Sequence, residues 1–387
     1  MARKKPSLWL AMGGACARAR RYLPAALTGG FAAIAGLDLE YWVGAFRTAP
    51  LAQDTSVYYV AAQIGLARGW NRIYDLTLQA QFFARLHAGV ADPSFFLYTN
   101  PPLLAWLIVP LTLVPPVGAY LAIVTLCLGA LTATAALAAP RDGWSRILFV
   151  LGALAWYPVV YSLRLGQLPL LIGAAVVLSW WLDQHGWPKL GGAVLAMTMI
   201  KPQLALLVAP CLLLAGRRGL FVTWLGSTLA LGLLSILSLG ASGVGQYFKL
   251  LAIIRTVPFD QQFTLAALGG GSAVTTALQA LAVILTLVAA YRIRHRGTAP
   301  VVAVALLGSV LAAPHLHVDD FAVLVPVAWL LLRDAHSAVQ RLGLLPMAVT
   351  MELAWVLGPL PILASLTISL LLFLVPRREQ RSMALAA

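Results

Sequence analysis

The run PVGAYLAIVTLCLGALTATAALAA, residues 116–139, contains no charged side chain. A helix that crosses a bilayer needs about 20 consecutive apolar residues, so this run is long enough to span one. Similar blocks of Leu, Ala, Val and Gly recur through the 387-residue chain, which is 61% hydrophobic and only 10% charged. Soluble domains carry roughly 25% charged residues. The sequence therefore predicts an all-α, polytopic membrane helix bundle, because its continuous blocks lack the alternation of membrane β-barrel strands.

The apolar blocks predict about 12 transmembrane helices in a single integral-membrane domain, residues 1–387. The expected spans are 22–41, 116–139, 146–163, 167–184, 188–201, 202–216, 219–240, 266–291, 299–313, 320–332, 342–357 and 360–376. Five prolines between residues 101 and 116 interrupt the pattern. Because proline breaks helices, residues 102–115 are expected to be re-entrant or interfacial rather than spanning.

The formal charge of +14 comes from short Lys and Arg clusters that lie between the apolar blocks. Such clusters stay on the cytoplasmic side of membrane proteins, so they indicate topology and not nucleic-acid binding. We expect cytoplasmic tails at 1–21 and 377–387, and outer loops at 42–101 and 241–265. The first block continues as an anchor, so no cleavable signal peptide is expected. The expected location is the cell (plasma or inner) membrane.

A polar island interrupts the apolar pattern between residues 53 and 100. It begins with QDTSVYY at 53–59 and ends with YTNPP at 98–102. A loop of this length usually has a function. Asp54 follows the first expected span at the outer interface, where a partly buried carboxylate can act as a general base toward an attacking hydroxyl. The alternative interpretation of Asp54 is a helix N-cap.

The aromatic and acidic residues in or near this island each allow two interpretations, one functional and one as ordinary residues of the membrane interface. The aromatic residues either stack on sugar rings or form the interfacial aromatic belt of a membrane protein. They are Tyr58, Tyr59, Trp70 and Tyr74. Asp38 and Glu40, near the end of the first span, could form a further functional acidic pair. The alternative interpretation is that they lie at the membrane interface without a chemical role.

Three polar residues are expected at the outer ends of spans, namely Arg164, Gln167 and Lys201. Cations belong preferentially on the inner side, and ionisable groups at membrane depth cost several kcal/mol unless they are paired. An anionic headgroup would pair them, because phosphate binding needs donors of this kind. The alternative is that the long side chains extend to lipid phosphates of the outer leaflet.

The turn PHLHVDD at 314–320 places His315 and His317 beside Asp319 and Asp320. Two histidines two residues apart are a weak metal signal, so hydrogen bonding to substrate or orientation of another group is the preferred role. The three cysteines lack metal-ligand spacing. We therefore expect neither a metal ion nor a cofactor.

Taken together, these residues resemble glycosyltransferase family 87, integral-membrane sugar transferases of the GT-C type that include polyprenyl-phosphate-mannose-dependent α-mannosyltransferases. The matching pieces occur in order along almost the whole chain. They are Asp54-x-x-x-Tyr58, Gly69 followed by Tyr74-Asp75, Tyr98-Thr99-Asn100-Pro101-Pro102 with Pro110 and Pro115, Gly166-Gln167, Lys201, Arg217-Arg218, and His315 with Asp319 and Asp320.

The resemblance implies transfer of a hexose, foremost mannose, from a polyprenyl-phosphate donor to a lipid- or glycan-borne hydroxyl on the outer face, with inversion. Asp54 would be the general base, and His315 with the outer cations would bind the donor phosphate or orient substrate. Membrane lipids would surround the protein, and no nucleic acid is expected. The expected substrate-binding residues are Tyr58, Tyr74, Asp75, Asn100, Arg164, Gln167, Lys201, Gln261, His315, His317, Asp319 and Asp320.

Two other functions also place polar residues outside a helix bundle. An O-antigen ligase or polymerase uses a lipid diphosphate donor, but its large loop usually comes late in the chain. A lipid or sugar transporter or flippase tends to have paired halves and broken helices near mid-membrane. The sequence shows no such repeat, and its ionisable groups are expected at one face.

Overall fold

The computed structural model describes residues 8–51, 53–86, 97–140, 143–269, 271–334 and 338–375. Within these ranges every regular element is an α-helix or a 3-10 helix, labelled η, which confirms the all-α prediction. The expected tail at 377–387, the first seven residues of the other tail, and residues 87–96 of the expected first outer loop lie outside the described residues.

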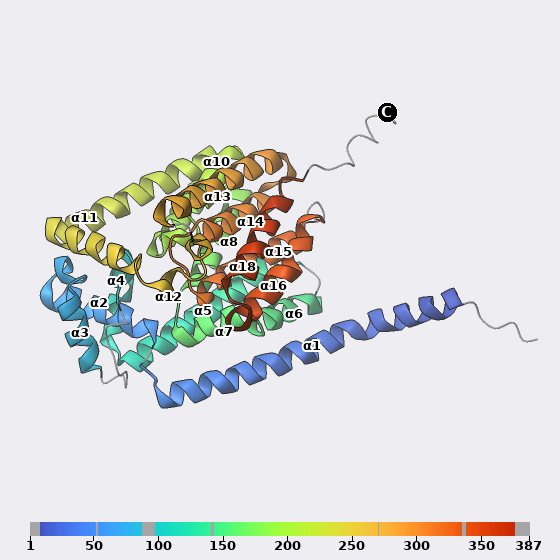
Figure 1. Ribbon diagram of the computed structural model, residues 1–387, viewed down its shortest axis with the longest axis horizontal. Helices are drawn as coiled ribbons and strands as arrows, with labels where there is room; N and C mark the ends of the chain where they lie inside the picture. Colours follow the sequence, from blue (N-terminus) through green and yellow to red (C-terminus); the bar gives the residue numbers. More distant parts are fainter. Residues whose placement is uncertain are drawn as a thin grey trace, which may run out of the picture.

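The helices follow one another through short connections (Figure 1). The first half contains α1 (Leu8–Thr48), α2 (Asp54–Arg68), η1 (Trp70–Arg72), α3 (Leu76–Arg85), α4 (Pro102–Ile108), η3 (Val109–Leu113), α5 (Pro116–Ala138), α6 (Gly143–Leu154), α7 (Tyr157–Leu165) and α8 (Pro169–Gln184). The second half contains α9 (Pro188–Ala196), η4 (Met197–Ile200), η5 (Pro202–Leu204), α10 (Val208–Leu214), α11 (Arg218–Ile254), α12 (Pro258–Gln261), η6 (Leu265–Leu268), α13 (Gly271–Ile293), η7 (Arg294–Arg296), α14 (Thr298–Leu311), η8 (Val318–Leu324), α15 (Val325–Arg333), η10 (Gln340–Gly343), α16 (Leu344–Glu352), α17 (Ala354–Leu357) and α18 (Pro359–Leu372).

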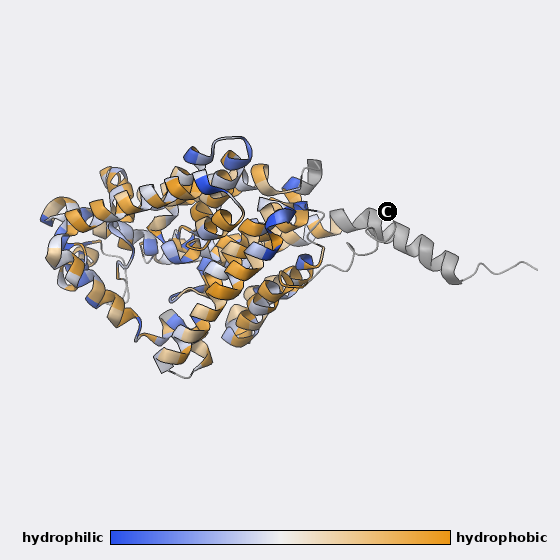
Figure 2. Cartoon of the chain, turned by 90° about the horizontal axis from the view of Figure 1, so that it is seen from above, coloured by the Kyte–Doolittle hydropathy of each residue, from blue (hydrophilic) through white to orange (hydrophobic). Residues whose placement is uncertain are grey.

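Three described helices are long and apolar enough to cross a bilayer, namely Pro116–Ala138, Arg218–Ile254 and Gly271–Arg296. A fourth span results if the pair Arg146–Leu154 and Tyr157–Leu165, bent by 66°, is counted as one. Hydrophobic residues predominate along the helices throughout the bundle (Figure 2). The chain is therefore a helical membrane protein.

The count of about 12 spans stays a prediction, because many expected spans are short or broken helices. Residues 188–216, expected to form two spans, contain two α-helices and two 3-10 helices around Pro202. The break expected near residue 115 is present, since a short apolar helix over Pro102–Leu113 ends before α5 begins at Pro116. At 1.5 Å per residue, a helix of that length is too short to cross a bilayer.

The expected loop regions are more helical than the sequence indicated. The described part of the first outer loop contains α2, η1 and α3, and α2 buries most of its side chains against α4 and α5. The second outer loop, expected to begin at 241, is instead helical up to Ile254. Gly240 has φ 59° and ψ −179°, so the chain breaks there and resumes as helix, a conformation that glycine adopts readily.

The centre of the bundle is α14, on which nearly every side chain is buried. It packs against α10, α13, α15 and α18. In the view of Figure 1, α1 runs along one side of the bundle and α11 along the opposite side. The polar residues of the candidate site come from four places in the chain. They lie at the start of α2 and in the segments that follow α7, η4 and α14.

Small residues bring α9 and α11 into close contact. A Cβ at Gly192 would lie 2.4 Å from the carbonyl oxygen of Leu220 and 2.8 Å from the backbone nitrogen of Trp224. Close backbone approach through small residues is a common basis of helix packing in membranes. Glycine at this position is therefore required by space and not by backbone conformation.

We expect Gly192→Ala to lower the free energy of unfolding by about 1–3 kcal/mol, because the new methyl group must push the two backbones apart. The measurement is the thermal unfolding temperature of the purified protein in detergent. Gly232→Ala is the matched control, since nothing lies within 4 Å of its Cβ position, and alanine favours the helix. Equal unfolding temperatures for the two variants would contradict the close packing.

Candidate active site

Asp54 is the first residue of α2 and follows the N-cap residue Gln53, whose backbone is extended. The Oδ2 atom of Asp54 accepts a hydrogen bond from Nε2 of Gln167 at 2.5 Å. The carboxylate is thus directed toward the connection between α7 and α8. Asp54 therefore does not cap α2, and its role as a general base stays a prediction.

Gln167 is placed by a tight turn between two helices. Gly166 ends α7 in the left-handed conformation, with φ 64° and ψ 35°, and α8 begins at Pro169. The hydroxyl of Thr55 donates to the carbonyl oxygen of Gly166 at 3.2 Å. A Cβ at Gly166 would lie 1.9 Å from that hydroxyl oxygen. Glycine therefore permits both the turn and the close approach of α2.

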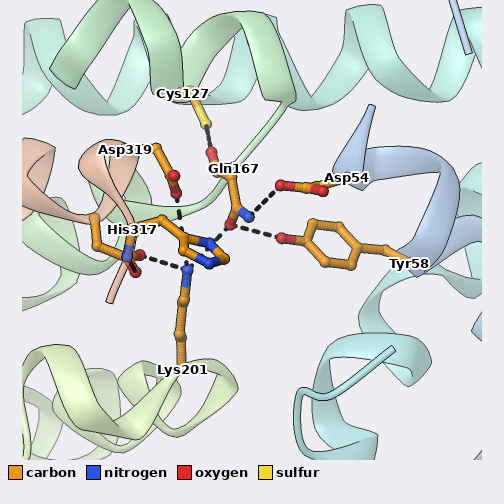
Figure 3. A network of polar contacts seen from close by, with 8 residues as sticks. Asp54, Tyr58, Cys127, Gln167, Lys201, His317 and Asp319 are labelled. Carbon is orange, nitrogen blue, oxygen red and sulfur yellow. Dashed lines mark hydrogen bonds and ion pairs between the residues drawn. The ribbon is translucent and has the colours of Figure 1, made fainter. Parts of the chain in front are cut away.

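The side chain of Gln167 connects three other polar groups (Figure 3). Its Oε1 accepts hydrogen bonds from the Tyr58 hydroxyl at 2.7 Å and from Nζ of Lys201 at 3.2 Å. Both partners are donors, so Oε1 must face them, and the amide NH2 must face Asp54. Gln167 thereby links the carboxylate of Asp54 to the ammonium of Lys201.

Lys201 lies at the break between η4 and η5, directly before Pro202. A residue before proline avoids helical backbone angles, and Lys201 has φ −147° and ψ 73°. Its side chain is only 6% exposed. The ammonium forms an ion pair with Oδ1 of Asp320, and its Nζ lies 4.0 Å from Oδ2 of Asp319. The helix break therefore delivers a buried cation to two carboxylates.

Asp319 and Asp320 lie in η8 and have no exposed surface. Oδ2 of Asp320 also accepts a hydrogen bond from the backbone N–H of His317 at 3.1 Å. Burial, together with the charge of Asp320, raises the pKa of Asp319 to about 7. Asp320 is thus the carboxylate that holds the full charge opposite Lys201.

Burial raises the pKa of Asp54 above its ordinary value. The hydrogen bond from Gln167 and the charges of His317 and Lys201 act in the opposite direction. Asp54 is only half-buried, whereas Asp319 and Asp320 are completely covered. Among these three carboxylates, Asp54 alone keeps exposed surface, and burial raises its pKa.

The two histidines lie beside this cluster. The ring centroids of His315 and His317 are 4.7 Å apart, edge to face, and the His317 ring lies 5.1 Å from that of Phe259 in α12. Within the described residues, no group of three or more His, Cys, Asp or Glu side chains is placed to hold a metal ion. A site without metal or cofactor stays a prediction.

Three expected substrate-binding residues in the polar island have structural contacts. The hydroxyl of Tyr74 donates to the backbone carbonyl of Asn100 at 2.7 Å. The ring of Tyr74 lies 5.8 Å from that of Tyr98 and 4.7 Å from that of Tyr247. The carboxylate of Asp75 accepts two backbone N–H groups and so caps α3. These contacts stabilise the fold of the island.

Two further residues that were expected to bind substrate, Arg164 and Gln261, form hydrogen bonds away from the Asp54 cluster. Arg164 donates to the hydroxyl of Tyr41 in α1 at 2.7 Å, and its guanidinium lies 4.8 Å above that ring. Gln261 donates a hydrogen bond to the carbonyl oxygen of Arg255. None of the hydrogen bonds or ion pairs described for these two residues, or for Tyr74, Asp75 and Asn100, reaches the Asp54 cluster.

The sequence analysis did not single out two residues that hold the turn at Gln167. One is Thr55, next to Asp54, whose hydroxyl contacts Gly166. The other is Cys127 in α5, whose thiol donates to the carbonyl oxygen of Gln167 at 3.4 Å. Cys127 is completely buried, and no local pattern in the sequence distinguishes it from an ordinary core residue.

A family model of glycosyltransferase family 87 matches residues 98–314, which is more than half of the chain. The match includes the turn at Gln167 and the break at Lys201, while Asp54 and the acidic pair of η8 lie outside it. No curated protein and no solved structure matched the chain. The extent of the family match shows that the chain is a membrane sugar transferase: it belongs to glycosyltransferase family 87.

Proposed function

We propose that this protein transfers a hexose, foremost mannose, from a polyprenyl-phosphate donor to a lipid- or glycan-borne hydroxyl. Family membership supports a membrane glycosyltransferase with a sugar donor and an acceptor. The observation that carries the mechanism is the convergence of Asp54, Gln167 and Lys201 in one hydrogen-bonded network. The pattern of basic clusters supports a location in the plasma or inner membrane with this network on the non-cytoplasmic face.

Asp54 acts as the general base in this proposal. The acceptor oxygen forms a bond to C1 of the hexose while the bond from C1 to the phosphate oxygen breaks, and the acceptor proton passes to the Asp54 carboxylate. A single displacement of this kind inverts the configuration at C1. Partial burial suits Asp54 to the role, because its raised pKa favours proton acceptance while the residue keeps some exposed surface.

The histidines are the groups best placed to receive the donor phosphate. His317 lies close enough to Asp54 for its charge to act on that carboxylate, and His315 lies against His317. A protonated imidazole donates a charge-assisted hydrogen bond to phosphate. In this arrangement the leaving phosphate departs with the polyprenol toward the imidazoles, while the base acts on the acceptor.

Lys201 is better suited to holding the neighbouring side chains in position than to binding the donor phosphate directly. Its ammonium is buried and already paired with Asp320, and it holds the amide oxygen of Gln167. Gln167 in turn donates to Asp54. Lys201 and Gln167 are therefore positioning residues that orient the base.

We expect Asp54→Asn to lower kcat by about 10²–10⁴-fold, because asparagine keeps the size of the side chain but cannot accept the proton. The assay is transfer from a panel of polyprenyl-phosphate sugars by the purified protein in detergent. Glu40→Gln, which changes an exposed carboxylate of α1, is the control and should retain activity. Full activity in a folded Asp54→Asn variant would exclude Asp54 as the base.

We expect Gln167→Met to move the acid limb of kcat/KM to higher pH. The hydrogen bond from Gln167 lowers the pKa of Asp54, so its loss raises that pKa further. Because the base must be ionised, activity is then lost at a higher pH as the solution is acidified, and it recovers at alkaline pH. Gln184→Met at the exposed end of α8 is the control. An unshifted acid limb would contradict the positioning role of Gln167.

We expect Lys201→Met to cost about 3–5 kcal/mol of folding free energy, because it leaves the buried charge of Asp320 without its partner. The double variant Lys201→Met/Asp320→Asn removes both charges and should recover most of the lost unfolding temperature. Thermal unfolding in detergent measures both proteins. If the double variant unfolds at the same temperature as the single variant, the ion pair between Lys201 and Asp320 does not stabilise the fold.

A further inference from the structure

A second group of aromatic and charged side chains lies where α1, α7 and the connection from α16 to α17 meet. The transfer chemistry proposed above does not use it. We call it the α1–α7–α17 group. Its members are Asp38, Tyr41, Tyr157, Tyr161, Arg164, Glu352 and Trp355.

The aromatic members pack on one another. Tyr157 and Tyr161 stack with ring centroids 5.4 Å apart, and the Trp355 ring meets Tyr161 edge-on at 6.2 Å. The indole N–H of Trp355 donates to the Tyr157 hydroxyl at 2.7 Å. Trp355 and Tyr41 remain 50% and 57% exposed. Together these rings form an ordered aromatic surface whose two end rings, Tyr41 and Trp355, stay about half exposed.

The charged members lie among these rings. Oε2 of Glu352 accepts a hydrogen bond from the backbone N–H of Tyr157 at 2.7 Å. The Arg164 guanidinium lies 4.8 Å above the Tyr41 ring and 5.6 Å from the Tyr161 ring. Asp38 lies close enough to Glu352 for their charges to interact, and its Oδ2 atom has no hydrogen-bond partner among the described residues.

The surface around the group is strongly apolar. On α1, Leu37 and Leu39 are 67% and 53% exposed, and on α17 Val356 is 81% exposed. Ionisable residues on such a face are costly and mark functional sites in membrane proteins. An interfacial aromatic belt accounts for Tyr41 and Trp355 but gives no reason for the carboxylates.

The group adjoins the Asp54 cluster through α7. Arg164 precedes Gly166 and Gln167 by less than one helical turn. Tyr161, one turn earlier, is close enough to Asp54 and Asp319 for their charges to act on its hydroxyl. A molecule bound on the rings of α7 is thus held next to the base.

The chemistry of the group fits a neutral sugar better than a phosphate. Two carboxylates and one guanidinium leave a net negative charge, which repels an anion. Carboxylates accept hydrogen bonds from hydroxyls, and the guanidinium donates several from one fork. Exposed rings provide flat apolar faces for the C–H faces of a pyranose, and the apolar surroundings suit a lipid anchor.

We propose that the α1–α7–α17 group is the acceptor subsite, which binds the hexopyranose headgroup of a membrane-anchored glycolipid and presents its free hydroxyl to Asp54. The proposal rests on the proposed transfer function. It adds the acceptor class and the residues that bind it. Trp355 and Tyr41 contact the ring faces, while Asp38 and Glu352 accept hydrogen bonds from ring hydroxyls.

Steady-state kinetics with octyl α-mannopyranoside and octyl β-glucopyranoside as acceptors test the proposal. Asp38→Asn should raise the acceptor KM about tenfold, the value of one hydrogen bond to a charged group. Trp355→Ala should also raise the acceptor KM, because it removes a ring on which the pyranose packs. The donor KM and the slow hydrolysis of the donor by water should stay within twofold. Glu40→Gln and Val356→Ala are the matched controls on the same two elements and should behave as the unmodified protein.

Unchanged acceptor KM values in both variants would overturn the proposal and leave these rings as an interfacial belt. A rise in donor KM alone would overturn it too, by assigning the group to the donor phosphate. Calorimetric titration with octyl α-mannopyranoside gives a readout without turnover, and weaker binding by folded Asp38→Asn supports the subsite. Failure of the unmodified protein to use any polyprenyl-phosphate sugar would count against the proposed function. In that case the titration alone decides whether the α1–α7–α17 group binds a hexopyranose.

Discussion

Lys201 is buried, and a buried ammonium needs a partner of opposite charge. Asp320 supplies the partner, and it is itself completely covered. Removing either member would leave the other as an uncompensated buried charge. The pair therefore fixes the distance between the break after η4 and the start of η8, and the surrounding helices must accommodate it.

The same ammonium also influences the orientation of the Asp54 carboxylate. Because Lys201 and Tyr58 both donate to the amide oxygen of Gln167, the amide nitrogen has one orientation left, toward Asp54. The Asp54 carboxylate is thus aligned by a series of contacts that runs from Asp320 through Lys201 and Gln167. The orientation of the Asp54 carboxylate depends on these neighbours as much as on its own position at the start of α2.

The sequence could predict the helical membrane class and most members of this cluster, because apolar runs and rare polar residues at their ends are local signals. It did not separate Asp54 from Asp75, since a carboxylate at a helix start can cap that helix or face another one. The partner of Arg164 depends on where α1 packs, which no local pattern encodes. Helix continuing beyond Gly240 was also missed, because one glycine in a positive-φ conformation interrupts a helix without ending it.

The ion pair joins a residue near the middle of the chain to one in its last quarter. A ribosome delivers Asp54 to the membrane long before it has made Asp320. Until η8 exists, Lys201 lacks its carboxylate partner, although Tyr58 is already present to donate to Gln167. The buried ion pair of this network is therefore completed only after η8 has been made, late in the synthesis of the chain.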